Sequence, residues 1–201
     1  MYGSTGEIIT EKAGHLNLGI PGIMCMGGAG GCLALCLVAD KNLPGYQIVL
    51  VGILGAMLFG MLTGLIYSFL TITLRQQQVV TGTALNILAA GICSYFQRVL
   101  FGVPTTPLRI DALPVIEIPL LSDIPVLGPI FFSQNILTYI GYILIPVAVF
   151  VLYKTSLGLT IRSTGENPEA VSVAGLNVNR IRFLTVVAAG ALCGLAGSFY
   201  T

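Results

Sequence analysis

Uncharged hydrogen-bonding side chains recur along a long apolar stretch in the middle of the chain, residues 76–97. Together with Ala90 they lie three or four positions apart, so a helix would carry them on one face. Lipid offers such groups no hydrogen-bond partner, and they must face other helices or a hydrated cavity. We predict a path for a neutral polar solute, lined by this face and one earlier residue: Asn17, Thr83, Asn86, Ser94 and Gln97.

Hydrogen bonding between helices without any path is the alternative for this face. The opposite side of the same helix carries apolar residues, and no charge stands on the polar side, which argues against an ion or proton relay. The apolar residues expected on the opposite side are Leu85, Leu88, Ile92 and Phe96.

The segment around Asn17 has a second unusual feature. Asn17-Leu18-Gly19-Ile20-Pro21-Gly22 precedes a cluster of glycines over residues 27–31. Proline and clustered glycine break or kink helices, and broken helices at membrane depth are tolerated where they line a cavity. The segment is therefore a second candidate for the path, although a simple turn before a span fits the residues equally well.

A short helix is predicted in the longest charged stretch between two apolar windows. Asn167 fits the N-cap of a helix over Pro168–Ala174, and Glu169 lies near the positive end of its dipole. Gly175 provides a stop, and Asn179 fits the cap of the following span. A short helix displayed between two spans is suited to docking a partner protein; a loop helix without a partner is the alternative.

No other group of residues supports catalysis or metal binding. The single histidine, His15, has no paired acid or nucleophile, and the cysteines lack histidine or carboxylate neighbours. No glycine-rich loop for nucleotide phosphates is present, and a net charge of +1 is not typical of nucleic-acid binding. We expect no cofactor, no metal, no nucleic-acid partner and no enzymatic activity. The cysteines are predicted to be packing residues: Cys25, Cys32, Cys36, Cys93 and Cys193.

The composition indicates which elements position these residues. Of the 201 residues, 55% are hydrophobic and 8% are charged, whereas a soluble domain carries about 25% charge; the mean hydropathy is +0.93. A membrane-spanning helix needs about 20 apolar residues. We predict an all-α polytopic transmembrane helix bundle with about five spans, the fourth helix starting near Gln134 because of Pro125 and Pro129. The charge-free windows are Leu16–Ala39, Tyr46–Leu74, Gln76–Gln97, Ile124–Tyr153 and Phe183–Thr201.

Small residues and basic residues predict packing and orientation. Small residues every four positions let backbones approach closely, and two such stripes are present: Ala56, Gly60, Gly64 and Ser68, and Gly190, Gly194 and Ser198.

Basic residues favour the cytoplasmic side of a membrane. This rule places the N-terminus, the turn near residue 75 and residues 154–182 inside, because they carry most of the basic residues: Lys12, Arg75, Lys154, Arg162, Arg180 and Arg182. The proline-rich connection over residues 99–129 is then outside, with extended or hairpin structure over Leu113–Leu121, and meets a soluble partner or is a plain loop.

Several motifs, in this order, resemble one family. They are Glu7-Ile-Ile-Thr-Glu-Lys-Ala-Gly14, Asn17-Leu-Gly-Ile-Pro-Gly22, Thr81-Gly-Thr-Ala-Leu-Asn86, Ile124-Pro-Val-Leu-Gly-Pro129, and Gly165-Glu-Asn-Pro-Glu-Ala170 with Ala174-Gly175. The chain resembles the permease family of bacterial ABC importers for nucleosides and simple sugars, which is related to the ribose and branched-chain amino-acid permeases. The resemblance covers nearly the whole chain.

The resemblance implies one permease domain over residues 1–201 in the bacterial plasma membrane. It implies a second permease subunit, a cytoplasmic ATPase subunit and an external solute-binding lipoprotein as partners, besides membrane lipid. Segment 154–182 would then be the coupling region that contacts the ATPase, with Gly165, Glu166, Asn167, Pro168, Glu169, Ala170 and Gly175.

The chain departs from the family pattern in two respects. A glutamate usually stands where this chain has Pro21. Family members usually have a further span before the motif at Glu7 and several after Gly194–Gly197, so the chain is expected to be part of a longer permease.

The expected function is a permease subunit that carries nucleosides or simple sugars by alternating access, with ATP hydrolysed in a separate subunit. An ion-gradient-driven carrier or passive channel is the alternative. A carrier would need an intramembrane carboxylate or histidine, and the charge-free windows contain none. An intramembrane enzyme, a third class, would have to use His15. Co-purification of an ATPase distinguishes the first two.

Overall fold

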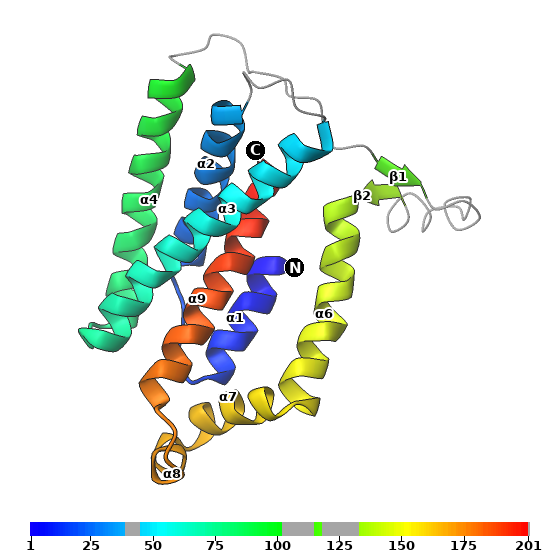
Figure 1. Cartoon of the computed structure of the whole chain (residues 1–201). Coiled ribbons are helices and arrows are strands. Elements are labelled where there is room, and N and C mark those ends of the chain that lie inside the picture. The colour runs from blue at the N-terminus through cyan, green and yellow to red at the C-terminus, as the bar shows by residue number, and fades with distance from the viewer. Residues whose placement is uncertain (39–44, 102–114, 118–132, 201) are drawn as a thin grey trace.

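The computed structural model describes residues 1–38, 45–101, 115–117 and 133–200, which are almost entirely helical (Figure 1). Within these ranges, five helices are long and apolar enough to cross a membrane: Ile20–Val38, Gln47–Thr73, Gln78–Val99, Ile136–Lys154 and Val178–Gly197. The predicted all-α polytopic transmembrane helix bundle is confirmed.

The elements follow one another along the chain without any large sheet. In order they are α1 (Tyr2–Lys12), α2 (Ile20–Val38), α3 (Gly45–Ser68), the π-helical turn η1 (Phe69–Thr73), α4 (Gln78–Phe101), β1 (Val115–Glu117), β2 (Ser133–Asn135), α6 (Ile136–Lys154), α7 (Ser156–Glu166), α8 (Pro168–Val173), α9 (Val178–Gly197) and the 3₁₀ turn η2 (Ser198–Tyr200).

The first span is a continuous helix, so of the two alternatives for its start the simple turn is confirmed and the broken helix is not. Pro21 is the second residue of α2. In the first turn of a helix the backbone N–H has no intrahelical partner, and proline is tolerated there. The glycines of α2 are used for packing: Gly22, Gly27, Gly28, Gly30 and Gly31 are all buried.

The last span begins earlier than the charge-free window predicts. α9 starts at Val178 and includes Arg180 and Arg182 in its first turns. Its N-cap is Asn177, whose side chain accepts a hydrogen bond from the Arg180 N–H at 3.2 Å, and not Asn179 as predicted. A window that excludes charge misses the end of a span where basic side chains reach the interface.

The centre of the bundle is formed by α2, α3 and α9, which meet through glycine. A Cβ added at Gly27 would lie 2.6 Å from the Gly194 Cα, and one at Gly64 would lie 3.2 Å from the Gly190 Cα. Backbones can come this close only where no side chain intervenes. The two predicted small-residue stripes are therefore confirmed as packing surfaces.

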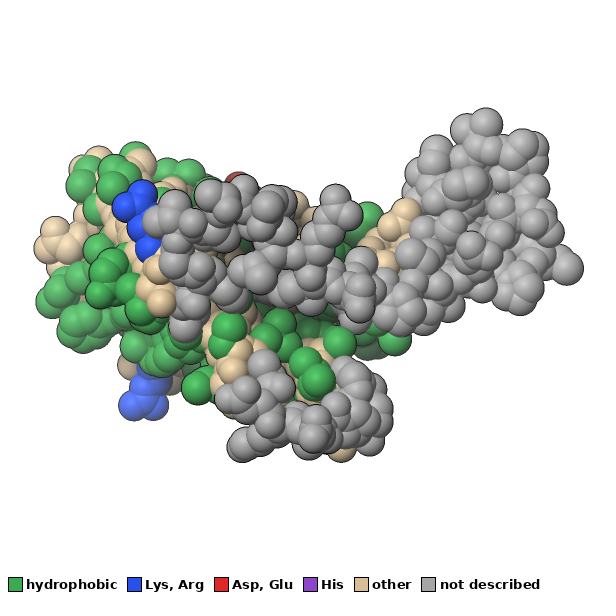
Figure 2. Space-filling view, turned by 90° about the horizontal axis from the view of Figure 1, so that it is seen from above, with side chains coloured by type: hydrophobic (Ala, Val, Ile, Leu, Met, Phe, Trp, Pro, Cys, Tyr) green, Lys and Arg blue, Asp and Glu red, His purple; other side chains and the backbone are tan. Residues whose placement is uncertain are grey.

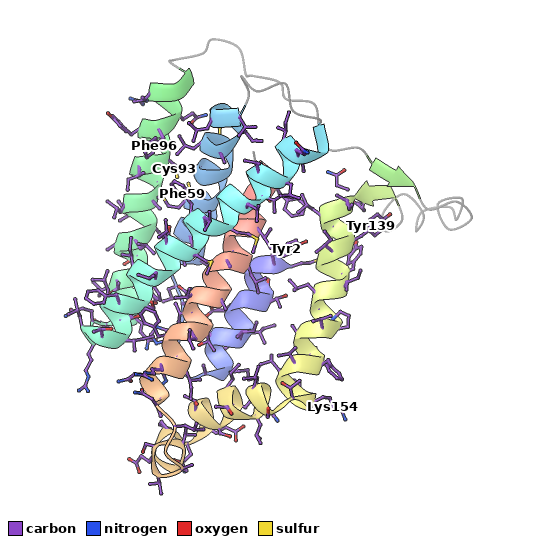
Figure 3. All side chains as sticks on the ribbon, viewed as in Figure 1. Tyr2, Phe59, Cys93, Phe96, Tyr139 and Lys154 are labelled. Atoms are coloured by element: carbon purple, nitrogen blue, oxygen red, sulfur yellow. The ribbon has the colours of Figure 1, made fainter. Side chains whose placement is uncertain are left out.

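α6 stands apart from this centre, and α1 fills the space between them (Figures 1 and 3). The Tyr2 side chain reaches from α1 to α6, where its hydroxyl donates to the Leu137 carbonyl oxygen at 2.6 Å. Beside the start of α6, β1 pairs antiparallel with β2, with Val115 opposite Asn135. Extended structure is thus confirmed for Val115–Glu117, while most of the 99–129 connection lies outside the described residues.

Several basic residues gather at one end of the bundle. α6 ends at Lys154 and α9 starts beside Arg180, at the same end as the turn with Arg75 (Figure 1). In the view of the opposite end, hydrophobic side chains make up much of the visible described surface, together with two small groups of Lys or Arg atoms (Figure 2). Tyr2 contacts the first turn of α6, far from Lys154, so α1 extends away from the basic end, and the cytoplasmic N-terminus stays a prediction. Only the end of α1, at Lys12, shares the basic end.

Candidate functional site

The turn between α1 and α2 is held on both sides by polar side chains of neighbouring helices. On the α1 side, the Glu7 Oε1 accepts a hydrogen bond from the Asn17 N–H at 3.1 Å. On the α4 side, the Asn86 Nδ2 donates to the Leu18 carbonyl oxygen at 3.0 Å, and its Oδ1 accepts from the Gly22 N–H at 2.8 Å. Asn86 therefore satisfies backbone groups at the start of α2 that have no intrahelical partner.

Asn17 is turned into the protein. It is 2% exposed, and its Oδ1 accepts a hydrogen bond from the Gly19 N–H at 3.1 Å. Its Nδ2 is buried and has no hydrogen-bond partner in the described part of the chain. An unpaired buried donor costs about 1–3 kcal/mol, so this amide destabilises the folded state locally.

His15 holds the same turn from below. Its Nε2 lies 3.0 Å from the Thr71 Oγ1, and Thr71 donates its own proton to the Tyr67 carbonyl oxygen at 2.8 Å. The Nε2 must therefore be the donor, and the Nδ1 accepts from the Gln78 Nε2 at 3.2 Å. Burial, together with the charge of Arg182, lowers the pKa of His15 to about 4. The ring is neutral and structural, which leaves it no role as an acid or a base.

The predicted path residues of α4 lie along one side of the helix, but Thr83, Ser94 and Gln97 do not contact Asn17. Thr83 donates to the carbonyl oxygens of Val79 and Val80 in its own helix. Ser94 and Gln97 are exposed and have no hydrogen-bond partner among the described residues. Only Asn86 is brought to the turn that contains Asn17.

α4 packs on α2 mainly through small and apolar residues. Leu85, which was expected on the face opposite the polar residues, is 6% exposed and belongs to the core cluster with Tyr67 of α3. Gly82 and Ala89 are buried on the same side. The polar residues therefore flank the contact with α2, on the side of α4 turned away from α3.

α2 presents a free strip on that same side. Ile20 and Met24 contact Gly3 of α1, and Gly22 contacts Asn86 of α4. The exposed residues Pro21 and Cys25 lie between these two contacts. We call this surface the α1–α2–α4 face. It comprises Ser4, Glu7, Pro21 and Cys25, and helical periodicity places Ser94 and Gln97 on the side of α4 that carries Asn86, which contacts α2.

A cavity of about 520 Å³ lies at the α1 edge of this face, and Glu7 is the one Asp, Glu, Lys or Arg among its lining residues. The lining residues are Met1, Gly3, Ser4, Glu7, Ile8, Ile20, Met24 and Ala196. A carboxylate accepts hydrogen bonds and donates none, so it selects partners that present O–H or N–H groups.

Glu7 lies at the level of the middle of α9. A Cβ on the adjacent Gly6 would be 3.2 Å from the Ala189 carbonyl oxygen, and α9 runs over Val178–Gly197. Glu7 lies outside the charge-free windows in sequence, yet α1 brings it beside this span. Sequence reasoning missed Glu7 because α1 is too polar to be recognised as part of the bundle. The helical spacing of the residues that α1 buries could have indicated a packed helix: Tyr2, Thr5, Gly6 and Thr10.

Opposing effects act on the Glu7 carboxyl. Burial raises the pKa of Glu7, and the charge of Glu11 acts in the same direction. The Asn17 N–H and the Thr10 hydroxyl, 3.2 Å from the Oε2, lower it because they favour the ionised form. The Thr10 hydroxyl shares its one proton between Oε2 and the Glu7 carbonyl oxygen at 2.9 Å, so both carboxylate oxygens retain a free lone pair.

The predicted coupling segment forms two helices at the basic end. α8 covers Pro168–Val173, one residue shorter than predicted; the Asn167 side chain caps it by accepting from the Ala170 N–H at 3.1 Å. Gly175 has a φ of +82°, a left-handed conformation that suits glycine. α7, which the sequence reasoning missed, joins α8 to α6.

The coupling residues divide into exposed and packed ones. Glu166, Asn167, Glu169, Ala170 and Gly175 are exposed. Gly165 instead packs on the end of α1, where an added Cβ would meet the Lys12 carbonyl oxygen and lie 3.0 Å from the Gly14 nitrogen. The coupling segment therefore touches the helix that carries Glu7.

Comparison with known proteins points to one family. The model of the family described as branched-chain amino acid transport system / permease component matches residues 3–201. No solved structure matches the chain.

Three relatives match almost the whole chain. The nucleoside ABC transporter permease protein NupC of Lactococcus lactis subsp. cremoris (strain MG1363) is 33% identical over 100% of this chain and 62% of its own length. The guanosine ABC transporter permease protein NupQ of Bacillus subtilis (strain 168) is 36% identical over 97% and 61%. TsgC13 of Haloferax volcanii, a glucose ABC transporter permease by its name, is 32% identical over 96% and 56%. The chain thus spans about three fifths of the length of these relatives.

Proposed function

The chain belongs to the permease component family of branched-chain amino acid transport systems, and on that premise we propose that it forms the solute path of an ATP-driven importer for nucleosides or simple sugars. The names of its relatives, which specify nucleosides, guanosine and glucose, support a neutral, hydroxyl-rich solute. The ATPase is a separate subunit, and an external solute-binding lipoprotein delivers the solute.

The α1–α2–α4 face is the observation that carries this proposal. Ser94 and Gln97 are exposed there without partners in the described chain, and Glu7 is only partly buried. Within lipid, Ser94 and the Glu7 carboxylate would be left unsolvated, at a cost of several kcal/mol for each unpaired group, whereas Gln97 lies near the end of the span Gln78–Val99. A second permease subunit covers the face, and the solute passes between the two subunits along Thr83, Asn86, Ser94 and Gln97.

Two contacts support a coupling of the ATPase to this path. Gly165 packs on the Lys12 carbonyl oxygen at the end of α1, and the Arg182 Nε donates to the Ala13 carbonyl oxygen at 3.0 Å. When the ATPase displaces α8, these contacts move the end of α1 and the turn at Asn17. Glu7 and Asn86 hold that turn, so the displacement reaches the path and alternates access to it.

An ion-gradient-driven carrier is the second candidate, and the position of Glu7 favours it. A carboxylate inside a helical bundle is a common site for a coupling ion or proton. In that mechanism the chain would work without an ATPase.

Reconstitution separates the two candidates. The complete permease is co-expressed with the ATPase and binding protein encoded beside it, and the assembly is placed in lipid vesicles with radiolabelled guanosine. We expect uptake that requires ATP and the binding protein. Uptake driven by an imposed ion gradient in the absence of ATP would favour the carrier instead.

A further inference from the structure

Glu7 is placed as a ligand-binding group and not only as a support for the turn. Its Oε1 accepts one hydrogen bond, from the Asn17 N–H at 3.1 Å, while the Thr10 hydroxyl near Oε2, at 3.2 Å, lies closer to the Glu7 carbonyl oxygen, at 2.9 Å. A carboxylate oxygen accepts about two hydrogen bonds. Both oxygens therefore keep one free position, and Glu7 lines the 520 Å³ cavity at the edge of the α1–α2–α4 face.

The remaining walls of the cavity restrict what it can hold. Ile20, Met24 and Ala196 are apolar, and Ser4 is the other residue of the lining with a side-chain hydrogen-bonding group. No lysine or arginine lines the cavity, so the carboxylate of an amino acid would find no cationic side chain there. A neutral solute with adjacent hydroxyl groups fits this arrangement, because two neighbouring O–H groups can donate to the two carboxylate oxygens.

We propose that Glu7 binds the vicinal hydroxyl groups of the transported solute, the diol of a ribose or of a simple sugar, with the apolar walls against the rest of the molecule. This inference rests on the proposed transport function and assigns its solute contact to a residue of α1. The same carboxylate then joins the solute to the turn at Asn17, which the coupling segment contacts through the end of α1.

The test compares a ribonucleoside with its analogue that lacks the diol. Uptake of guanosine and of 2′,3′-dideoxyguanosine is measured in vesicles that contain the complete transporter, and the affinity of the isolated binding protein for each solute is measured separately, so that the part of the KM difference due to the permease is known. In the wild type, the KM for guanosine should be about tenfold to a hundredfold lower than the KM for the analogue, which is the range expected for one lost charge-assisted hydrogen bond. Glu7→Gln keeps an oxygen for the Asn17 N–H and should raise the KM for guanosine to that of the analogue, with the analogue unchanged.

A control variant and the alternative outcomes test whether Glu7 binds the diol. Glu11→Gln removes an exposed carboxylate one turn further along α1 and should leave both KM values unchanged. Equal loss of both solutes in Glu7→Gln, or a wild-type transporter that does not discriminate between them, overturns the inference; the latter measurement needs no variant to fold. Import of leucine in preference to guanosine, abolished by Glu7→Gln, would show that Glu7 binds an ammonium group instead. If the wild type imports no nucleoside or sugar, the proposed function fails as well.

Discussion

At the scale of single residues, buried polar side chains organise the turn that precedes α2. His15 is 3% exposed, and both ring nitrogens are used within the protein. The ring can take up a second proton only by breaking one of these hydrogen bonds in a buried place. The turn therefore depends on a neutral imidazole.

This dependence predicts a loss of stability in acid. The unfolded chain binds a proton near pH 6.5, and folded His15 does so only near pH 4. Between these values the unfolded state holds more protons, so stability is complete above pH 6.5 and falls as the pH drops towards 4, by about 3 kcal/mol. Melting temperatures recorded in detergent at a series of pH values from 7.5 to 4.5 measure this loss of stability.

A variant without the ring provides the control. Because the chain has one histidine, His15→Gln removes this titration and leaves the carboxylates in place. Its melting temperature should be lower at pH 7.5 and should change less with pH than that of wild type. The same pH dependence in both proteins would contradict the assignment.

Asn86 and Gln97 lie on the same helix but should behave differently when replaced. Asn86→Leu removes the partners of the Gly22 N–H and the Leu18 carbonyl oxygen, which should cost about 2–4 kcal/mol at about 1–2 per unpaired group. Gln97→Leu removes an exposed group without partners in the described residues. It should leave the melting temperature unchanged and lower solute uptake. Unaltered uptake in Gln97→Leu would show that the residue is not part of the path.

At the scale of elements, glycine determines which helices form the centre. A Cβ at Gly194 of α9 would meet the Ala56 carbonyl oxygen and the Gly60 Cα of α3. A Cβ at Gly91 of α4 would meet nothing within 4 Å. The same substitution should therefore have opposite effects at the two positions.

Gly194→Ala should destabilise the protein by about 1–3 kcal/mol, the cost of overpacking a tight contact. Gly91→Ala should raise stability by up to about 1 kcal/mol, because alanine is the better helix former. Thermal unfolding of both variants in the same detergent gives the comparison. Equal melting temperatures would mean that α3 and α9 do not approach as closely as described.

Much of the element pattern could be predicted from sequence, and the exceptions have physical causes. Length and apolarity suffice for α2, α3, α4 and α6, because crossing lipid demands both. α1 could not be predicted in this way: its polar residues pair inside the bundle, as Glu7 does with Asn17. The contact of α4 with α2 was not identified from sequence, because the buried residues Gly82, Leu85 and Ala89 make it and small apolar residues carry no polar signal.

At the scale of the whole molecule, a chain of contacts runs from the displayed helix to the path. α8 follows α7, Gly165 at the end of α7 packs on Lys12, and α1 carries Glu7 beneath the turn at Asn17. A force on α8 would therefore reach Glu7, the proposed solute contact, through covalent and packing contacts. Rigid elements with two arrangements are what such coupling needs.

Reversing the charge on α8 tests this connection. Glu169 is exposed in the first turn of α8, where a carboxylate favours the helix dipole. Glu169→Arg should weaken α8 only slightly, by about 0.3–1 kcal/mol, but should present the wrong charge to the ATPase. ATP hydrolysis should then continue in vesicles at its basal rate while solute uptake falls.

Arg98→Glu is the control. It reverses an exposed charge in the last turn of α4, at the end of the bundle far from α8, and should retain coupled uptake. Since Glu169 is far along the chain from Glu7, a fall in uptake with an unchanged KM for the solute would separate coupling from binding. Normal solute-stimulated hydrolysis and uptake in Glu169→Arg would mean that the ATPase contacts the permease elsewhere.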